Sequence, residues 1–429
     1  MSKSLSLRTL TLGCKVNQYE TEFVRQGLID AGHYRDADEG ESADLCIINT
    51  CTVTNEGDSK SRQAIRRLAR NNPAARVVVM GCYATRAPEE LRVLPNVVEV
   101  VTDKRELPDL LGRFGVVDIP NGISRFGDRH RAYIKVQDGC LLRCSYCIIP
   151  QVRPEMHSRA SHEIVEEARR LIDNGYREIV LTGIHLGHYG VDHNSGKTKA
   201  DWNRLSTLVR RLVEIPGEFR IRLSSIEATE VTRELLEVMR DHADKVCPHL
   251  HVCLQSGSDD VLRRMKRRWG SQRFIDRCAL VRDYLHKPAL TTDVIVGFPG
   301  ETEAEFQETC DVVRKVGFSK VHIFPFSARR GTPAAEMPDA ISKAEKSDRV
   351  HRLAEVEAVG RSAYFESLVG EQLEVLIEGT RETSDTGDET MIGTACRYAP
   401  VQLPQGVPGT LLSVKIDAAC GSEGLRVEQ

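Results

Sequence analysis

The first part of the chain alternates short apolar runs with segments whose apolar residues recur at helical spacing. The apolar runs are typical of buried strands, and the segments between them are typical of helices. Strand, helix, strand at this spacing predicts a parallel sheet with crossover helices. The expected strands span residues 7–12, 45–49, 76–80 and 97–101, and the expected helices span residues 20–31, 59–71 and 88–91.

A second and longer series of the same kind begins at Tyr133. Its six βα units predict a partial barrel, because a closed barrel needs eight. The expected strands span residues 133–137, 178–182, 220–224, 249–254, 291–296 and 320–324. The expected helices span residues 162–174, 204–214, 232–242, 272–286 and 303–316.

The pattern changes again after a long helical segment at residues 343–368. Short strand-like runs separated by glycine and proline then predict a small β-barrel, with strands at residues 372–378, 391–395 and 411–416. The fold class is therefore α/β. We expect an N-terminal parallel-sheet domain at residues 1–115, a linker at 116–131, a partial (βα)6 barrel at 132–364 and a small β-barrel at 365–429.

Composition restricts the class of protein. The chain has 429 residues and a formal net charge of −3, so any nucleic-acid contact must come from local basic patches. No apolar run is long enough to cross a membrane, and residues 1–8 lack a secretory signal, so we expect a cytoplasmic protein without a membrane partner. Thirteen cysteines in such a chain favour metal binding or cysteine chemistry over a disulfide framework.

Cys14, Cys51 and Cys82 each follow one of the expected strands of the first domain. The carboxyl ends of parallel strands meet at one edge of a sheet, where ligands bind, and helix N-termini there favour thiolates. The plainer interpretation is three small buried hydrophobic side chains, the commoner fate of a free cysteine. The strand-end position of all three favours a metal site, whereas Cys46, in mid-strand, takes the plainer interpretation.

A tighter group of cysteines follows the first strand of the second series. Cys140, Cys144 and Cys147 lie in one loop, at spacings of four and three residues. Structural zinc sites and fully ligated 4Fe–4S clusters usually take four protein ligands. Three thiols therefore indicate a cluster with one iron left open for another ligand.

This loop, with Tyr146 before its last cysteine, resembles the hallmark of the radical S-adenosylmethionine (SAM) enzymes. Together with Cys14, Cys51 and Cys82 it is similar to the methylthiotransferases of that group. In those enzymes an N-terminal domain holds a second cluster on three cysteines, and a C-terminal β-barrel called TRAM binds RNA. The segments that carry the resemblance are residues 12–17, 49–53, 81–82, 140–147, 181–183, 222–227, 254–258 and 293–302.

Residues 14–20 and 182–185 resemble the branch of the family that acts on threonylcarbamoyladenosine in tRNA. The resemblance implies two 4Fe–4S clusters on the six cysteines, SAM as a cofactor, and transfer of a methylthio group to carbon two of that base next to the anticodon. No catalytic residue beyond the cluster ligands is expected, since the cofactors supply the chemistry. The alternative substrates are isopentenyladenosine in tRNA and a ribosomal-protein aspartate. The alternative of another class is an iron–sulfur redox or RNA-binding protein.

Candidates for the SAM pocket lie near the carboxyl ends of the barrel strands, where barrel active sites form. The resemblance assigns Gly183, Gln255, Asp293 and Gly297 to this pocket, together with Tyr146. Packing explains the glycines equally well at the level of single residues. An acid beside a strongly apolar strand, as Asp293 is, is the hardest to explain by packing.

RNA contact requires a basic surface. The run at residues 263–269 combines phosphate-binding charge with an aromatic ring, although a solvated helix face is the plainer interpretation of any such run. From Phe365 onward there are four basic and eleven acidic residues, a poor balance for binding phosphate. The candidate RNA-binding residues are Arg263, Arg264, Lys266, Arg267, Arg268 and Trp269.

The resemblance also implies partners. These are a tRNA substrate and an electron donor such as flavodoxin or ferredoxin, and the chain is expected to be a monomer; the sulfur donor stays open. Pro154 stands after Arg153 where the family commonly has glycine, which leaves the path of the loop past Pro150 open.

Overall fold

The computed structural model describes residues 4–127, 129–382 and 389–428. These residues form two compact units. Unit 1 comprises residues 1–127, 133–174 and 327–335, and unit 2 comprises residues 128–132, 175–326 and 336–429. The α/β class is confirmed, whereas the division into four segments stays a prediction. No helix in the described part of the chain is both long and apolar enough to cross a membrane.

Unit 1 is built on a five-stranded parallel sheet in the order β2-β1-β3-β4-β5. The four expected strands are present, and β2 is an addition because three residues are too few for a periodic pattern. The strands are β1 (Leu5–Thr11), β2 (Tyr34–Asp36), β3 (Leu45–Thr50), β4 (Arg76–Gly81) and β5 (Val97–Val100). The helices are α1 (Lys15–Asp30), α2 (Asn55–Asn71), α3 (Cys82–Arg86), α4 (Pro88–Arg92), η1 (Lys104–Glu106) and α5 (Leu107–Arg113).

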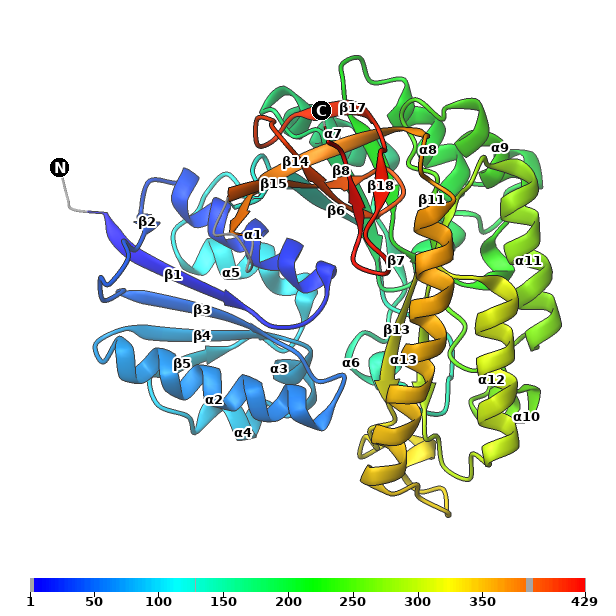
Figure 1. Cartoon of the computed structure of the whole chain (residues 1–429). Helices are drawn as coiled ribbons and strands as arrows, with labels where there is room; N and C mark the ends of the chain where they lie inside the picture. Colours follow the sequence, from blue (N-terminus) through cyan, green and yellow to red (C-terminus); the bar gives the residue numbers. More distant parts are fainter. Residues whose placement is uncertain (1–3, 128, 383–388, 429) are drawn as a thin grey trace. The chain divides into compact units, whose positions relative to one another are not determined.

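Helices cover both faces of this sheet, as Figure 1 shows for α1 and α5 on one side and α2 and α4 on the other. Successive residues of a strand point to opposite faces, so Ile47 packs against α1 and α5 while Ile48 packs against α2. Both faces of the central strand β3 are therefore buried, which explains the apolar run from Leu45 to Ile48.

Unit 1 also contains the segment that carries the second group of cysteines. Its elements are β6 (Arg131–Asp138), which belongs to unit 1 from Tyr133 on, α6 (Ile149–Val152), β7 (His157–Ser158) and α7 (Ser161–Asp173). β6 pairs with the antiparallel strand β7. The buried Glu167 of α7 accepts a hydrogen bond from the Tyr19 hydroxyl at 3.0 Å and from the Ile123 backbone N–H at 2.7 Å. This carboxylate fixes α7 to α1 and to the segment expected as a linker.

Unit 2 contains the remaining barrel strands, which are parallel. The strand expected at residues 220–224 ends early, because the backbone changes its hydrogen-bonding neighbour after residue 224. The Ser224 N–H donates to the Leu181 carbonyl of β8, whereas the Ile226 carbonyl accepts from the N–H of Cys253, which follows β11. The strands are β8 (Glu178–Gly183), β9 (Arg220–Leu223), β10 (Ser225–Ile226), β11 (His249–Val252), β12 (Ala289–Val296) and β13 (Lys320–Pro325).

Helices flank these strands on the outside, where α9, α11, α12 and α13 lie in sequence in Figure 1. The α-helices are α8 (Leu205–Val213), α9 (Arg233–Asp241), α10 (Asp259–Arg264), α11 (Ser271–Tyr284), α12 (Glu303–Val316) and α13 (Lys343–Glu366). The short 3₁₀ helices are η2 (Leu186–His188), η3 (Val191–His193), η4 (Lys199–Asp201), η5 (Ala228–Glu230) and, in unit 1, η6 (Pro333–Ala335).

The C-terminal part of unit 2 is a curled six-stranded sheet in the order β17-β14-β15-β16-β19-β18. The three expected strands are present, but among the described residues no pairing of β17 with β18 closes the sheet into a barrel. The strands are β14 (Gln372–Glu382), β15 (Glu389–Ala395), β16 (Pro400–Leu403), β17 (Leu411–Lys415), β18 (Ala418–Ala419) and β19 (Leu425–Arg426).

Buried charge holds this curled sheet against the barrel strands of unit 2. Glu178 accepts from Arg220 Nε at 2.7 Å and from Arg222 Nη2 at 2.9 Å. The two guanidinium groups also donate to backbone carbonyls of residues 374 and 394–396 in the curled sheet. On the rim, Glu374 pairs with Arg220 at 3.5 Å and Glu371 pairs with Lys287 at 2.8 Å. Part of the acidic charge of the C-terminal segment is thus neutralised within the unit.

Candidate functional site

The three N-terminal cysteines lie at the carboxyl ends of three neighbouring parallel strands. Cys14 is the residue before α1, Cys51 follows β3, and Cys82 is the first residue of α3, directly after β4. A Cβ atom placed on Gly13 would lie 3.3 Å from the Cys51 Sγ, so the Cys14 and Cys51 segments are in contact. Burial raises the pKa of the Cys51 thiol to about 11, and the nearby thiols of Cys82 and Cys14 add to this rise. The topology therefore brings the three thiols together.

Two buried asparagines hold these strand ends in place. Asn17 donates from its amide to the carbonyls of Leu12 and Thr50, at 3.0 and 3.1 Å. Asn49 donates in turn to the Asn17 carbonyl at 2.9 Å. These bonds connect the segment before Cys14 with the segment before Cys51, so the asparagines set the spacing of two of the thiols.

Gly81 allows Cys82 its position. Its φ of 99° lies in the region that favours glycine, and a Cβ there would lie 2.2 Å from the Asn49 Oδ1 and 2.4 Å from the Thr50 carbonyl oxygen. Any side chain at this residue would displace the Asn49 amide or the end of β4. The glycine before Cys82 is thus required by both backbone conformation and space.

The second group of cysteines lies on the loop between β6 and α6. Cys140, Cys144 and Cys147 are all partly exposed, and the Cys147 N–H donates to the Cys144 carbonyl at 3.1 Å. Gly139 starts the loop with a φ of 74°, and a Cβ there would lie 1.8 Å from the Glu155 carbonyl oxygen. Tyr146, half-buried, lies between the last two cysteines.

Arg153, directly after α6, connects the two groups of cysteines within unit 1. Its Nε donates to the Cys82 Sγ at 3.4 Å, and its carbonyl oxygen accepts from the Cys140 N–H at 3.4 Å. Its Nη1 lies 2.8 Å from carboxylate oxygens of both Glu20 and Asp138, and its Nη2 donates to Glu20 and to the Asn17 amide oxygen. The side chain is 1% exposed, so the loop past Pro150 is anchored by a fully paired buried guanidinium.

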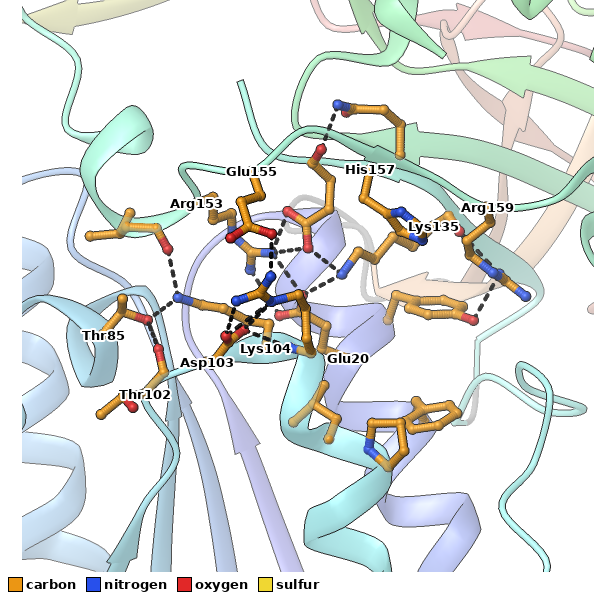
Figure 2. A pocket seen from close by; sticks show the side chains of 18 of the residues that line it. Glu20, Thr85, Thr102, Asp103, Lys104, Lys135, Arg153, Glu155, His157 and Arg159 are labelled. Atoms are coloured by element: carbon orange, nitrogen blue, oxygen red, sulfur yellow. Dashed lines mark hydrogen bonds and ion pairs between the residues drawn. The ribbon is translucent and has the colours of Figure 1, made fainter. Parts of the chain in front are cut away.

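A cavity of about 500 Å³ adjoins this network within unit 1. Figure 2 shows Lys104, Lys135, Arg153 and Glu20 converging on it from η1, β6, the loop after α6, and α1. Burial alone would raise the pKa of Glu20, but Arg153 and Lys135 outweigh it and lower that pKa to about 2. Burial lowers the pKa of Lys104, whose ammonium donates to Thr85 and to the Val152 carbonyl oxygen at 2.9 Å.

The donor sets fit iron–sulfur clusters. No cysteine in the described part of the chain forms a disulfide, and each set offers three thiols, which bind iron as thiolates. Three thiols leave one iron of a 4Fe–4S cluster open, which is the position a SAM molecule or a sulfur species would need. Both sets belong to the same compact unit.

The residues expected at a SAM pocket lie in unit 2, apart from Tyr146. Gly183 ends β8, and Asp293 lies in β12 with an oxygen 3.3 Å from the His251 Nε2. Gln255 has a φ of 69° and bonds through its backbone to Asp293 and Ile295, at 2.8 Å each. Gly297 directly follows β12 and has a φ of 70°, and a Cβ there would lie 2.4 Å from the Lys346 side chain, so packing also requires this glycine.

The residues expected to bind RNA divide into two sets. Arg263, Lys266 and Arg268 are exposed. Arg264 instead pairs with Glu305 at 2.9 Å. The Arg267 side chain is 3% exposed and pairs with Glu227, to which the buried Trp269 also donates at 3.3 Å. In this conformation Trp269 is a packing residue whose ring is not open for stacking on a base.

Sequence reasoning missed the residues that position the thiols. Asn17 and Asn49 lie inside segments that carried the family resemblance, and Arg153 precedes the unusual Pro154, yet none had an assigned role. The signal available in the sequence was a polar residue close to each cysteine segment. Glu20 lies at the end of another such segment without an assigned role, and Lys104 gave no signal because its partner Val152 is 48 residues away.

Known protein families and named proteins are similar to this chain in sequence. The radical SAM superfamily matches residues 134–313, and a family described as "Uncharacterized protein family UPF0004" matches residues 7–103. A protein of Bacillus subtilis (strain 168) named threonylcarbamoyladenosine tRNA methylthiotransferase MtaB is 41% identical over 426 residues, which cover 95% of this chain and 92% of that protein. A protein of the same name from Thermotoga maritima is 38% identical, covering 87% and 86%.

More distant relatives carry other names. A tRNA-2-methylthio-N(6)-dimethylallyladenosine synthase of Mycobacteroides abscessus is 34% identical, covering 95% of this chain and 85% of that protein. A solved structure of the radical SAM methyltransferase TsrM from Kitasatospora setae, with cobalamin and a 4Fe–4S cluster bound, has a TM-score of 0.56 at 15% identity. The match covers 78% of this chain and 77% of that chain, and it shows similarity of the fold alone. The chain belongs to the radical SAM family of tRNA methylthiotransferases, and it is more similar in sequence to these two threonylcarbamoyladenosine enzymes than to the dimethylallyladenosine synthase.

Proposed function

We propose that this enzyme adds a methylthio group to carbon two of N6-threonylcarbamoyladenosine in tRNA. The observation that carries the proposal is the pair of three-thiol sets within one compact unit, each set leaving one iron of a 4Fe–4S cluster open. The identity of 41% to the Bacillus subtilis protein of that name supports the choice of substrate.

The two thiol sets have different roles in this proposal. Cys140, Cys144 and Cys147 hold the cluster that binds SAM, and the N-terminal set, Cys14, Cys51 and Cys82, holds the second cluster. When bound, these groups supply the radical and the sulfur. The protein contributes position and charge: Asn17 and Asn49 set the spacing of the N-terminal thiols, and Gly139 gives the second loop its turn.

We assign Tyr146, Gly183, Gln255, Asp293 and Gly297 to the SAM pocket. Gly183 ends β8, Gln255 follows β11 and Gly297 follows β12, which supports this because barrel active sites form at the carboxyl ends of the strands. Gln255 is the strongest candidate for this pocket. Its left-handed backbone conformation is unusual for a residue with a side chain, and two backbone hydrogen bonds hold it in place.

For tRNA we propose that the exposed Arg263, Lys266 and Arg268 provide phosphate contacts, with the partly exposed Arg264 beside them. Reversal of charge in the double variant Lys266→Glu, Arg268→Glu should weaken tRNA binding and flatten its salt dependence. Arg240→Glu, an exposed change elsewhere in unit 2, is the matched control. Unchanged affinity and an unchanged salt slope in the double variant would contradict this surface.

The proposed partners follow from the chemistry. Reduction of the SAM-binding cluster needs a low-potential electron donor such as flavodoxin or ferredoxin, and we expect a monomer that acts in the cytoplasm.

The experiment that tests the function is mass spectrometry of tRNA nucleosides from a deletion strain with and without this gene. The methylthio form of threonylcarbamoyladenosine should return with the intact gene and not with Cys144→Ala or Cys51→Ala. Cys278→Ala, which removes a buried thiol in unit 2, should restore the product. Methylthiolated isopentenyladenosine instead would move the chain to the other tRNA branch, and no methylthiolated nucleoside at all would contradict the proposal.

A further inference from the structure

Arg153 is held in a single orientation by its surroundings. All three of its guanidinium nitrogens have partners, and the two carboxylates of Glu20 and Asp138 take both terminal nitrogens. This leaves Nε directed at the Cys82 Sγ at 3.4 Å. A guanidinium is rigid and planar, so bonds at one end fix the direction of the donor at the other.

Arg153 belongs to a network of charged side chains beside Cys82. Arg153 and Lys135 pair with Glu20 and Asp138, two cations against two carboxylates. Lys104 adds a further cation, and among the described residues it forms no ion pair with a carboxylate. Its ammonium donates to Thr85, on the helix that begins with Cys82, and to the carbonyl oxygen of Val152, the residue before Arg153.

The Arg153 guanidinium is the cation of this network that contacts a ligand of the N-terminal cluster, through the bond from its Nε to the Cys82 Sγ. Glu20 and Asp138 orient Arg153, and all three residues line the cavity of about 500 Å³, on which Figure 2 shows Glu20 and Arg153 converging. Hydrogen bonds and charge at a cluster sulfur raise its reduction potential, and both act more strongly in a buried environment than in water.

We propose, resting on the function above, that Arg153 is a positioning residue of the N-terminal cluster. Its Nε–H fixes the Cys82 sulfur, and together with the Lys104 ammonium it raises the reduction potential of the cluster held by Cys14, Cys51 and Cys82. Through its carbonyl bond to the Cys140 N–H, the same residue keeps the loop of the second thiol set in register with the first.

The test uses the full chain with Cys140, Cys144 and Cys147 all changed to alanine, so that only the N-terminal cluster is formed. After anaerobic reconstitution, the iron content is measured. The reduction potential of the cluster is then determined by a redox titration monitored by electron paramagnetic resonance. The variants are Arg153→Gln, Arg153→Lys and Lys104→Gln. The control is Arg159→Gln, which removes another nearly buried arginine lining the same cavity, one that donates to Glu167, Tyr19 and a backbone carbonyl.

Arg153→Gln should lower the ratio of reduced to oxidised cluster at a fixed potential by about tenfold, as expected for loss of a charged hydrogen bond. Arg153→Lys keeps the charge but not the directed Nε–H, so its shift should be smaller, and Lys104→Gln should shift the ratio in the same direction. Arg159→Gln should leave the ratio unchanged.

Equal potentials for the unsubstituted cluster, Arg153→Lys and Lys104→Gln would overturn the proposal. These two variants also decide the case if Arg153→Gln loses its iron, because Lys104 lies on the wall of the cavity and outside the carboxylate pairs of Arg153. Failure of the chain with Arg153 intact to assemble any cluster would instead count against the proposed function, so the two failures are distinguishable.

Discussion

Glu178→Gln tests how the curled C-terminal sheet is attached within unit 2. Glu178 is fully buried and is the shared carboxylate of Arg220 and Arg222, and an oxygen of it lies 3.8 Å from Arg131. Burial alone would raise its pKa, but Arg222 and Arg220 outweigh burial and hold the pKa well below its usual value. The amide of glutamine would leave two buried guanidinium groups without their charged partner.

The expected cost follows from this geometry. Removal of one partner of a buried ion pair costs about 3–5 kcal/mol, since a buried charge is left uncompensated. For a unit of this size that corresponds to a fall in Tm of about 6–20 °C. Both tryptophans of the chain, Trp202 and Trp269, lie in unit 2, so tryptophan fluorescence during urea or thermal denaturation reports its unfolding.

Glu374→Gln is the matched control for this experiment. Glu374 pairs with the same Arg220, but at 3.5 Å and with a third of its side chain exposed, so its loss should cost about 0–1 kcal/mol. A destabilisation by Glu178→Gln no larger than that of Glu374→Gln would refute the reasoning, because it would mean that the buried carboxylate contributes no more than the rim pair.

The pH dependence supplies a second readout. A depressed folded-state pKa gives stability that is present above the unfolded pKa of about 4.3 and is lost as pH falls toward the folded value. Below pH ~4 the advantage of the unsubstituted protein over Glu178→Gln should therefore shrink by up to about 1.4 kcal/mol per pH unit. A difference that stays constant from pH 6 to pH 3 would contradict the assigned shift.

Two further substitutions test local features. Gly81→Ala should abolish iron binding by the N-terminal set, because its Cβ would lie 2.2 Å from the Asn49 Oδ1. The control Gly40→Ala also has a positive φ, of 79°, but a Cβ there has nothing within 4 Å, so this variant should keep the iron. Equal iron content in both variants would contradict the steric argument. Thr302→Ala should destabilise unit 2 by about 1 kcal/mol, since the Thr302 hydroxyl accepts from the Glu305 N–H at the start of α12, and Thr302→Ser should not. Urea denaturation of both Thr302 variants checks this prediction. Identical unfolding midpoints for the two variants would mean that the capping hydrogen bond does not stabilise unit 2.

The regular part of the fold was predictable because local patterns determine it. The apolar run at the start of β3 indicates a strand buried on both faces, and the helical spacing at residues 303–316 matches α12 residue for residue. The three-residue β2 and the break between β9 and β10 have no such pattern. They depend on which neighbouring strand offers a free edge, and that is a tertiary property.

The acidic C-terminal segment shows the same limit. Its composition argues against phosphate binding, but Glu371 and Glu374 pair with basic residues elsewhere in unit 2. Charge counted along the sequence therefore overstates the negative charge that this segment presents to a partner. Likewise Trp269 lies in a basic run whose composition predicts a stacking surface, yet the protein buries its ring beside Phe274.

The sequence by itself determined the chemistry: two sets of three cysteines, their spacing, and their places at the ends of apolar runs identify the cluster ligands as candidates. Only the tertiary structure decided what holds and tunes them. Arg153, Glu20 and Lys104 reach the Cys82 region from residues 20, 104 and 153, and such a network has no period or spacing to detect. The physical reason is that ligand type is a property of one residue, whereas buried charge balance is a property of all the groups that folding brings together.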